Sequence, residues 1–264
     1  MKKLVKKILT VGDGKKRYQN LFETLLNISL RGMNYGNGAD YRESGELNVL
    51  KYLSEKFKKE KLIVLFDVGG NVGNYSKALS DFFKTNATIH SFEPSKKTYE
   101  IFLDTTSNIQ NIVPNNFGFS DTETNQLLYT NGDASGLASI YQRNLEHAGI
   151  SMDKSEEIRL STIDAYCKTN NIDRIHFLKL DIEGHELKAL NGAKQMIRDN
   201  RIDVIQFEFG GCNIDSRTYF QEFYYLLKDK YHIYRILKDG LLEMPTYKET
   251  YEIFITINYL ALKK

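Results

Sequence analysis

The chain has 264 residues, which suits one large α/β domain with an added segment better than two full domains. Its composition, 41% hydrophobic and 27% charged, is that of a folded globular protein and argues against a disordered chain. The formal net charge of +2 is too small for the strongly basic surface typical of nucleic-acid binding, so no nucleic-acid partner is expected.

The N-terminus is basic, and its aliphatic residues alternate with seven cationic ones: Lys2, Lys3, Lys6, Lys7, Lys15, Lys16 and Arg17. Two interpretations stay open, namely peripheral contact with an anionic membrane face and a solvated helix or frayed end. No apolar stretch approaches the ~20 residues of a membrane span, and a signal-peptide core with a cleavage site is lacking. We therefore expect a cytoplasmic protein, with a peripheral place at the inner membrane face as the alternative.

Residues 17–60 are predicted to be helical, with a break rich in Gly and Asn from Gly32 to Gly38. A second helix is expected from about Ser44 to Phe57, because apolar residues recur near helical spacing and Ser44 is a suitable N-cap. Residues 1–60 are thus predicted to form a helical extension of a domain that spans residues 61–264.

From residue 61 onwards, short apolar runs alternate with helical stretches. Five runs, at residues 62–66, 87–92, 112–116, 175–180 and 204–209, predict a parallel sheet buried between helices. A helix is expected over residues 216–227, then two strands over 231–236 and 252–262 joined by a turn at Lys238-Asp239-Gly240. The predicted fold is a doubly wound, mostly parallel, seven-stranded α/β sheet with an antiparallel last strand, and its ligands are expected at the carboxyl ends of the strands.

Residues 121–160 are polar and harder to interpret, and they end in an expected strand over residues 157–163. This insertion enters between the third and fourth core strands. It would therefore lie over the same carboxyl edge as the ligand, which suggests a substrate lid.

A glycine bend follows the first predicted strand, with the sequence Asp67-Val68-Gly69-Gly70-Asn71-Val72-Gly73 and then Asn74 at the start of a helix. Glycines let the backbone turn tightly and let a ligand approach the main chain. The spacing is neither GxGxxG nor a P-loop. Glu93 ends the second predicted strand about twenty residues further on, where a carboxylate can accept hydrogen bonds from ribose hydroxyls. Asp121 follows the third strand, where the adenine edge is expected, so the pattern indicates an adenosine with free hydroxyls.

Three segments resemble the FkbM-type methyltransferase family: Asp67 to Gly73, Phe92-Glu93-Pro94, and Leu178-Lys179-Leu180-Asp181-Ile182-Glu183-Gly184-His185-Glu186. The similarity runs from about Asp67 to Glu208, and Tyr259-Leu260-Ala261 resembles a glycan-linked branch. The resemblance implies a class I, Rossmann-like methyltransferase that uses S-adenosylmethionine (SAM) to methylate a hydroxyl, often on a sugar. The residues expected to bind the cofactor are Asp67, Gly69, Gly70, Asn71, Gly73, Asn74, Glu93, Pro94, Asp121 and Asp181.

The sulfonium of SAM is already electrophilic, so such a protein must mainly align the acceptor oxygen with the methyl group. A hydroxyl is a poor nucleophile while protonated, and a base or a metal would help remove its proton. The candidates beyond strands four and five are Asp181, Glu183, His185 and Glu208. His185 titrates near neutral pH and is the preferred base. The alternative for His185 is a structural role, capping a helix over residues 187–196.

Asp181 and Glu208 offer a further alternative, because hard divalent cations prefer oxygen ligands. The expected partner is a small-molecule or glycan acceptor, and the sequence does not set the oligomeric state. Two other functions stay open: an NAD-type Rossmann oxidoreductase and a non-catalytic cofactor-binding scaffold of a glycan-synthesis complex. The missing GxGxxG spacing argues against the oxidoreductase.

Overall fold

A computed structural model describes residues 12–37 and 40–264. The first four basic residues, at positions 2, 3, 6 and 7, lie outside this range, while Lys15, Lys16 and Arg17 are exposed. In the described part of the chain, no helix is long and apolar enough to cross a membrane. Membrane contact through the N-terminus therefore stays a prediction.

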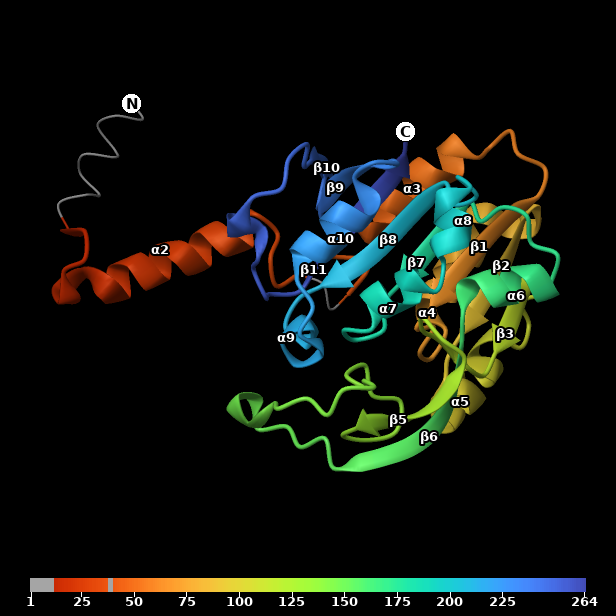
Figure 1. Cartoon of the computed structure of the whole chain (residues 1–264), viewed down its shortest axis with the longest axis horizontal. Coiled ribbons are helices and arrows are strands. Elements are labelled where there is room, and N and C mark those ends of the chain that lie inside the picture. The colour runs from red at the N-terminus through yellow and green to blue at the C-terminus, as the bar shows by residue number, and fades with distance from the viewer. Residues whose placement is uncertain (1–11, 38–39) are drawn as a thin grey trace.

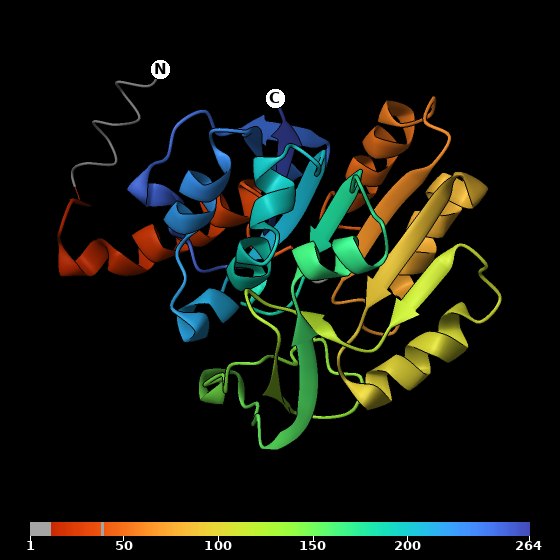
Figure 2. The same cartoon turned by 45° about the vertical axis from the view of Figure 1, so that its right-hand side comes forward.

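The centre of the molecule is an eight-stranded sheet in the order β10-β9-β11-β8-β7-β1-β2-β3 (Figures 1 and 2). Its strands are β1 (Ile63–Val68), β2 (Ala87–Phe92), β3 (Ile112–Asn115), β7 (Phe177–Leu180), β8 (Val204–Phe209), β9 (Tyr231–Leu237), β10 (Gly240–Glu243) and β11 (Ile257–Lys263). β3, β2, β1, β7 and β8 are parallel, whereas β11 is antiparallel to both β8 and β9. The predicted doubly wound, mostly parallel fold is therefore confirmed.

Helices cover both faces of this sheet because alternate strand residues point to opposite sides. Phe66 and Val68 pack in one hydrophobic cluster, and Ile63 and Leu65 pack in the other. The first cluster includes α6 (Ile163–Thr169), α7 (Glu186–Asn191), α8 (Lys194–Arg198) and α10 (Phe220–Leu227). The second includes α3 (Glu46–Lys56), α4 (Asn74–Phe83) and α5 (Lys96–Thr106). Both faces are thus buried, as a parallel sheet requires.

The C-terminal part differs from the sequence prediction. Lys238-Asp239-Gly240 leads from β9 into β10, which pairs back on β9 as an eighth strand, so the turn does not connect to the last strand. The last strand begins at Ile257 rather than at residue 252. The helix expected over residues 216–227 is α10, which starts at Phe220, after a short α9 (Cys212–Ser216).

The N-terminal part contains two helices of different character. α2 (Gln19–Gly32) projects from the body and buries only Leu30 (Figures 1 and 2). α3 instead packs Val49, Leu50 and Leu53 against the sheet. The N-cap of α3 is Gly45, one residue after the predicted Ser44. Only glycine fits at this position, because the backbone has a φ of +102° and a Cβ would lie 2.2 Å from the Leu237 carbonyl oxygen. The second helix of the predicted helical extension thus belongs to the core of the sheet domain.

The insertion contributes two strands, β5 and β6 (Figure 1), to a second, three-stranded sheet in the order β4-β6-β5, in which β4 lies just before the insertion. β4 is Gly118–Phe119, β5 is Thr124–Thr130 and β6 is Lys154–Ser161. The strand predicted over residues 157–163 therefore starts and ends earlier, because Thr162 caps α6 with its side chain. Between β5 and β6 the chain folds back, and Ser139 bridges to Tyr129.

Candidate active site

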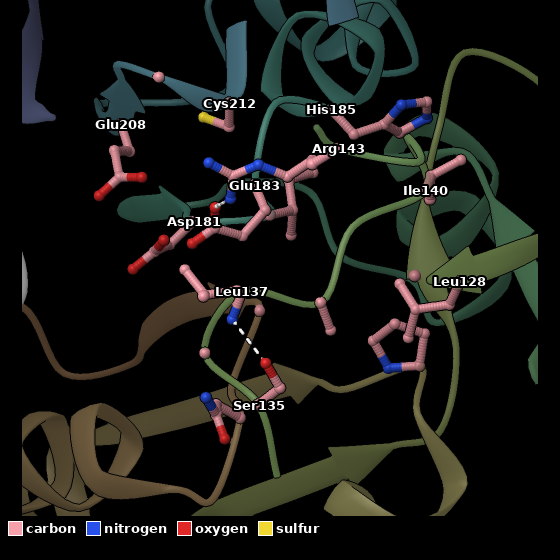
Figure 3. Close-up of a pocket in the computed structure, with 18 of the residues that line it drawn as sticks. Leu128, Ser135, Leu137, Ile140, Arg143, Asp181, Glu183, His185, Glu208 and Cys212 are labelled. Atoms are coloured by element: carbon pink, nitrogen blue, oxygen red, sulfur yellow. Dashed lines mark hydrogen bonds and ion pairs between the residues drawn. The ribbon is translucent and has the colours of Figure 1, made fainter. Parts of the chain in front are cut away.

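A cavity of about 690 Å³ lies at the carboxyl ends of β1, β2, β7 and β8, and the insertion forms its opposite wall. Figure 3 shows Asp181, Glu183 and Glu208 on one side and Leu128 and Ile140 on the other. Sequence-predicted residues that line the cavity are Gly69, Asn71, Glu93, Pro94, Asp181, Glu183, His185 and Glu208. The insertion thus covers the carboxyl edge, where its predicted role as a lid requires it to be.

The glycine bend after β1 brings the chain against the end of β7. Gly69 has a φ of +88°, and a Cβ there would lie 1.8 Å from the Asp181 carbonyl oxygen, so only glycine fits. Asn71 also has a positive φ, of +45°, and lines the cavity. Its buried Oδ1 has no hydrogen-bond partner among the described residues. A buried polar atom without a partner, in a residue that lines a cavity, is suited to a ligand there.

Glu93 is held in place by the main chain at the end of β2. Its Oε2 accepts a hydrogen bond from the Asn71 N–H at 3.0 Å, and its Oε1 accepts one from the Ser95 N–H at 2.9 Å. Each carboxylate oxygen can accept a second bond. Burial raises the pKa of Glu93 to about 7, although the two N–H groups oppose the shift. With the apolar side chains of Pro94 and Phe119 beside it, this end of the cavity fits an adenosine.

Five predicted cofactor residues do not line the cavity: Asp67, Gly70, Gly73, Asn74 and Asp121. Asp67 is fully buried and accepts a hydrogen bond from Ser76 at 2.6 Å. Gly73 is the N-cap of α4, with a φ of +89°. Asp121 forms an ion pair with Lys188 at 2.8 Å. These residues shape the bend and the surface around the cavity, and Asp121 is not brought to the adenosine end.

Glu208 stands out among the cavity acids. It lies near the end of β8, is 6% exposed, and has no hydrogen-bond or ion-pair partner among the described residues. Burial and the neighbouring carboxylates of Asp181 and Glu183 raise the pKa of Glu208 well above its ordinary value. Glu208 is therefore a buried acid that can interact with a ligand in the cavity.

Glu183 is tied to the insertion by both its main chain and its side chain. The Ser139 hydroxyl donates to the Glu183 carbonyl at 2.7 Å, and the Arg143 guanidinium lies 2.5 Å from the Glu183 carboxylate. Glu183 has a φ of +52°, which is uncommon for a residue with a side chain. Burial and Asp181 raise the pKa of Glu183 to about 8, although Arg143 opposes the shift.

His185 uses both of its ring nitrogens within the protein. Nδ1 lies 3.0 Å from the Tyr141 hydroxyl, and Nε2 lies 2.9 Å from the Ser120 hydroxyl. Burial lowers the pKa of His185 to about 4, so the ring is neutral near pH 7, with one nitrogen donating and the other accepting. It occupies the N-cap position of α7 without a side-chain capping bond. The geometry thus favours a structural role for His185 over the predicted role as base. The structural contacts are those to Tyr141 and Ser120, and not the expected side-chain cap of the helix.

The predicted catalytic and cofactor residues do not include Ser120, Ser139 or Tyr141, which contact the loop after β7. A signal was present in Ser139-Ile140-Tyr141-Gln142-Arg143, because alternate residues of an extended segment share one side. Ser139, Tyr141 and Arg143 indeed contact that loop. Glu183 and His185, the residues that they contact, are 40 or more residues further along the chain, so no local sequence pattern indicates the pairing.

One group of side chains has the spacing of metal ligands. Ligand atoms of Glu183, Glu208 and Cys212 lie within 4.8 Å of one another. The group contains Glu208 but not Asp181, so it differs from the predicted pair. Cys212 is a soft ligand that hard cations such as Mg²⁺ do not prefer. The cation site predicted at Asp181 and Glu208 stays a prediction.

The fold and the cavity define a class I SAM-dependent methyltransferase, with a glycine bend after β1 and an acid after β2 in a doubly wound sheet. The sequence profile of the Methyltransferase FkbM domain matches residues 67–236, and the chain belongs to this family. Membership of this family supports SAM as the cofactor and argues against the alternative of an NAD-type oxidoreductase.

Among characterised relatives, the hexuronic acid methyltransferase AglP of Haloferax volcanii is 25% identical over 167 residues. The match covers 63% of this chain and 64% of AglP, so it leaves about a third of the relative unmatched. Two solved structures are also similar. An O-methyltransferase from Bacillus cereus in complex with SAH is 10% identical, with a TM-score of 0.42 and coverage of 97% of this chain and 96% of that one. The O-methyltransferase TomG from Streptomyces achromogenes in complex with SAM is 7% identical, with a TM-score of 0.43 and coverage of 82% and 80%.

Proposed function

We propose that this methyltransferase transfers the methyl group of SAM to a hydroxyl group of a sugar, in a surface glycan or a glycosylated metabolite. The observation that carries the proposal is the position of Glu208. It is a buried carboxylate without a partner among the described residues, and it lines the same cavity as Glu93, the acid assigned to the ribose. One cavity thus offers a donor end and an acceptor end. The match to a hexuronic acid methyltransferase supports a sugar as the acceptor.

At the donor end, the chain supplies polar contacts and an apolar wall. The Glu93 carboxylate accepts hydrogen bonds from ribose hydroxyls, and the Asn71 amide oxygen accepts one further donor. Pro94 and Phe119, which line the cavity, would hold the flat adenine ring. When bound, SAM supplies a methyl group on a positively charged sulfur.

At the acceptor end, Glu208 accepts the proton of the acceptor hydroxyl as the oxygen becomes methylated. Its raised pKa makes it a stronger base once ionised, and this suits removal of a proton from a hydroxyl. Asp181 is proposed to contact the methionine part of the cofactor, and Glu183 to hold the insertion through Arg143. His185 keeps the same segment in place through Tyr141.

A divalent cation at Asp181 and Glu208 is the second route by which the hydroxyl could lose its proton. The two routes differ in one measurement. If Glu208 acts as a base, activity survives treatment with a chelator and subsequent removal of the chelator. If a cation is required, activity is lost on this treatment and returns when Mg²⁺ or Mn²⁺ is added.

Incubation with SAM carrying a ¹³C-methyl group tests the proposal. The acceptors are a panel of neutral sugars, uronic acids, amino sugars and their nucleotide conjugates, with a sample lacking sugar as control. The expected product shows an O-methyl carbon signal in NMR. A methyl group found only on nitrogen, or on none of these acceptors but on added RNA or protein, would refute the sugar hydroxyl as acceptor.

A further inference from the structure

Lys179 is a buried cation directly beneath the cavity. It is the third residue of β7 and is 4% exposed. Its ammonium nitrogen lies 2.8 Å from Asp181 Oδ2, 3.9 Å from Asp67 Oδ1, and 4.5 Å from the centre of the Tyr75 ring. A buried ammonium is costly unless it is paired, and these contacts keep this one charged.

The partners of Lys179 differ in what they contact. Asp67 is fully buried, opposite Lys179 in the register of β1 and β7, and its other oxygen accepts from Ser76. Asp181 has a side chain that is 36% exposed and lines the cavity. Lys179 therefore connects the interior of the sheet to one carboxylate on the cavity wall.

The contact leaves one oxygen of Asp181 available. Lys179 donates to Oδ2, while no described residue donates to Oδ1. The main chain of Asp181 is fixed as well, because its N–H donates to the Val68 carbonyl at 3.0 Å and its carbonyl faces Gly69. With the backbone and Oδ2 both held, the direction of Oδ1 is determined.

We propose that Lys179 is a positioning residue of the methyl-transfer site, which orients the Asp181 carboxylate so that Oδ1 binds the positively charged methionine part of SAM. The inference rests on the proposed contact between Asp181 and the cofactor. Lys179 does not touch the cofactor and acts through Asp181 alone. A carboxylate fixed beforehand binds more tightly because less side-chain freedom is lost on binding.

A double-mutant cycle tests this inference, with SAM affinity measured by isothermal titration calorimetry for wild type, Lys179→Met, Asp181→Asn and the double variant. Each single substitution is expected to weaken SAM binding about tenfold, which corresponds to about 1.4 kcal/mol. The double variant is expected to bind no more weakly than Asp181→Asn, because Lys179 has then lost the group through which it acts. In turnover assays the KM for SAM should rise while kcat at saturating SAM changes less.

The outcomes separate the two proposals. If Asp181→Asn weakens SAM binding but Lys179→Met does not, the positioning role is overturned and the role of Asp181 stands. The same holds if the loss of SAM affinity in the double variant equals the product of the two single losses. If Asp181→Asn binds SAM like wild type, both are overturned.

Two further variants guard against an effect of misfolding. Lys58→Met removes an exposed lysine of a surface ion pair and is expected to bind SAM like wild type. Lys179→Gln keeps an N–H donor and is expected to retain more SAM affinity than Lys179→Met. The positioning role would be overturned if SAM affinity in Lys179→Met and Lys179→Gln depended only on the melting temperature of each variant and not on the presence of an N–H donor.

Discussion

The guanidinium of Arg143 lies 2.5 Å from the carboxylate of Glu183, with side chains that are 8% and 17% exposed. Arg143 belongs to the insertion, whereas Glu183 belongs to the loop after β7. The pair therefore joins the wall contributed by residues 121–160 to the acids at the carboxyl edge. A second carboxylate, Asp215, lies 3.5 Å from Arg143 and balances its charge further.

Replacement of Arg143 by Met is expected to loosen the insertion. The variant removes the donor that the buried Glu183 carboxyl binds and the positive charge beside Asp215, at a cost of about 2 kcal/mol. Amide hydrogen exchange should become faster over residues 131–150, and the KM for the acceptor should rise more than the KM for SAM. Arg159→Met is the control, because Arg159 is exposed in the same insertion and packs on Phe117 away from the cavity. Equal exchange rates in wild type and Arg143→Met would contradict the role of the pair.

Replacement of Glu208 by Gln is expected to lower kcat about 100-fold, the usual contribution of a general base. SAM affinity should stay unchanged, because Glu208 is assigned to the acceptor end. In wild type, kcat should still increase with pH above the range in which an ordinary glutamate ionises, because burial and the neighbouring acids raise the pKa of Glu208. Glu243→Gln, at an exposed site, is the control. A Glu208→Gln enzyme with wild-type kcat would exclude Glu208 as the base.

Replacement of His185 by Phe distinguishes a structural role from a catalytic one. The variant loses two hydrogen bonds and leaves the Tyr141 hydroxyl unpaired, while Ser120 keeps only its bond to Asp121, so the free energy of unfolding should fall by about 2 kcal/mol. The pKa of His185 is lowered from 6.5 to about 4, so its contribution to stability is complete above pH 6.5 and lost as the pH falls through 4. Chemical denaturation at several pH values measures this. If the variant keeps wild-type stability and loses kcat instead, His185 is the base.

SAM binding is expected to strengthen as the pH rises through about 7, where Glu93 ionises, because its pKa is raised by burial. The ionised carboxylate accepts hydrogen bonds with both oxygens, whereas the protonated form must donate with one of them. Calorimetric titrations between pH 6 and pH 8 should show this trend in wild type. Glu93→Gln should bind SAM more weakly and without this dependence on pH. A wild-type affinity that is constant over this range would contradict the assignment of Glu93 to the ribose.

Much of the sheet was predictable because its strands are buried on both faces and therefore stand out as apolar runs. The bounds of β2 and β8 match the predicted runs, and every residue of β8 is buried. β10 was missed because it is short and none of its residues is buried, so its sequence does not differ from that of a loop. The bounds of β5 were also not predictable, because only Leu128 of this strand is buried.

The site was predictable to the extent that it depends on strand ends. Glu93, Asp181 and Glu208 each follow or end a strand of one parallel sheet, and the structure brings all three to one cavity. The state of His185 was not predictable. Its partners Ser120 and Tyr141 are 65 and 44 residues away, and only the folded chain brings them to the ring. Without these contacts, the sequence shows a histidine free to titrate near neutral pH.

The central claim is that one cavity holds the adenosine of the cofactor against Glu93 and leaves its sulfur facing Glu208. A crystal structure of the protein with S-adenosylhomocysteine tests this most directly. We expect the ribose hydroxyls within hydrogen-bond distance of the Glu93 carboxylate and the sulfur on the side of Asp181 and Glu208. A ligand bound elsewhere, or in this cavity with its ribose away from Glu93, would contradict the claim.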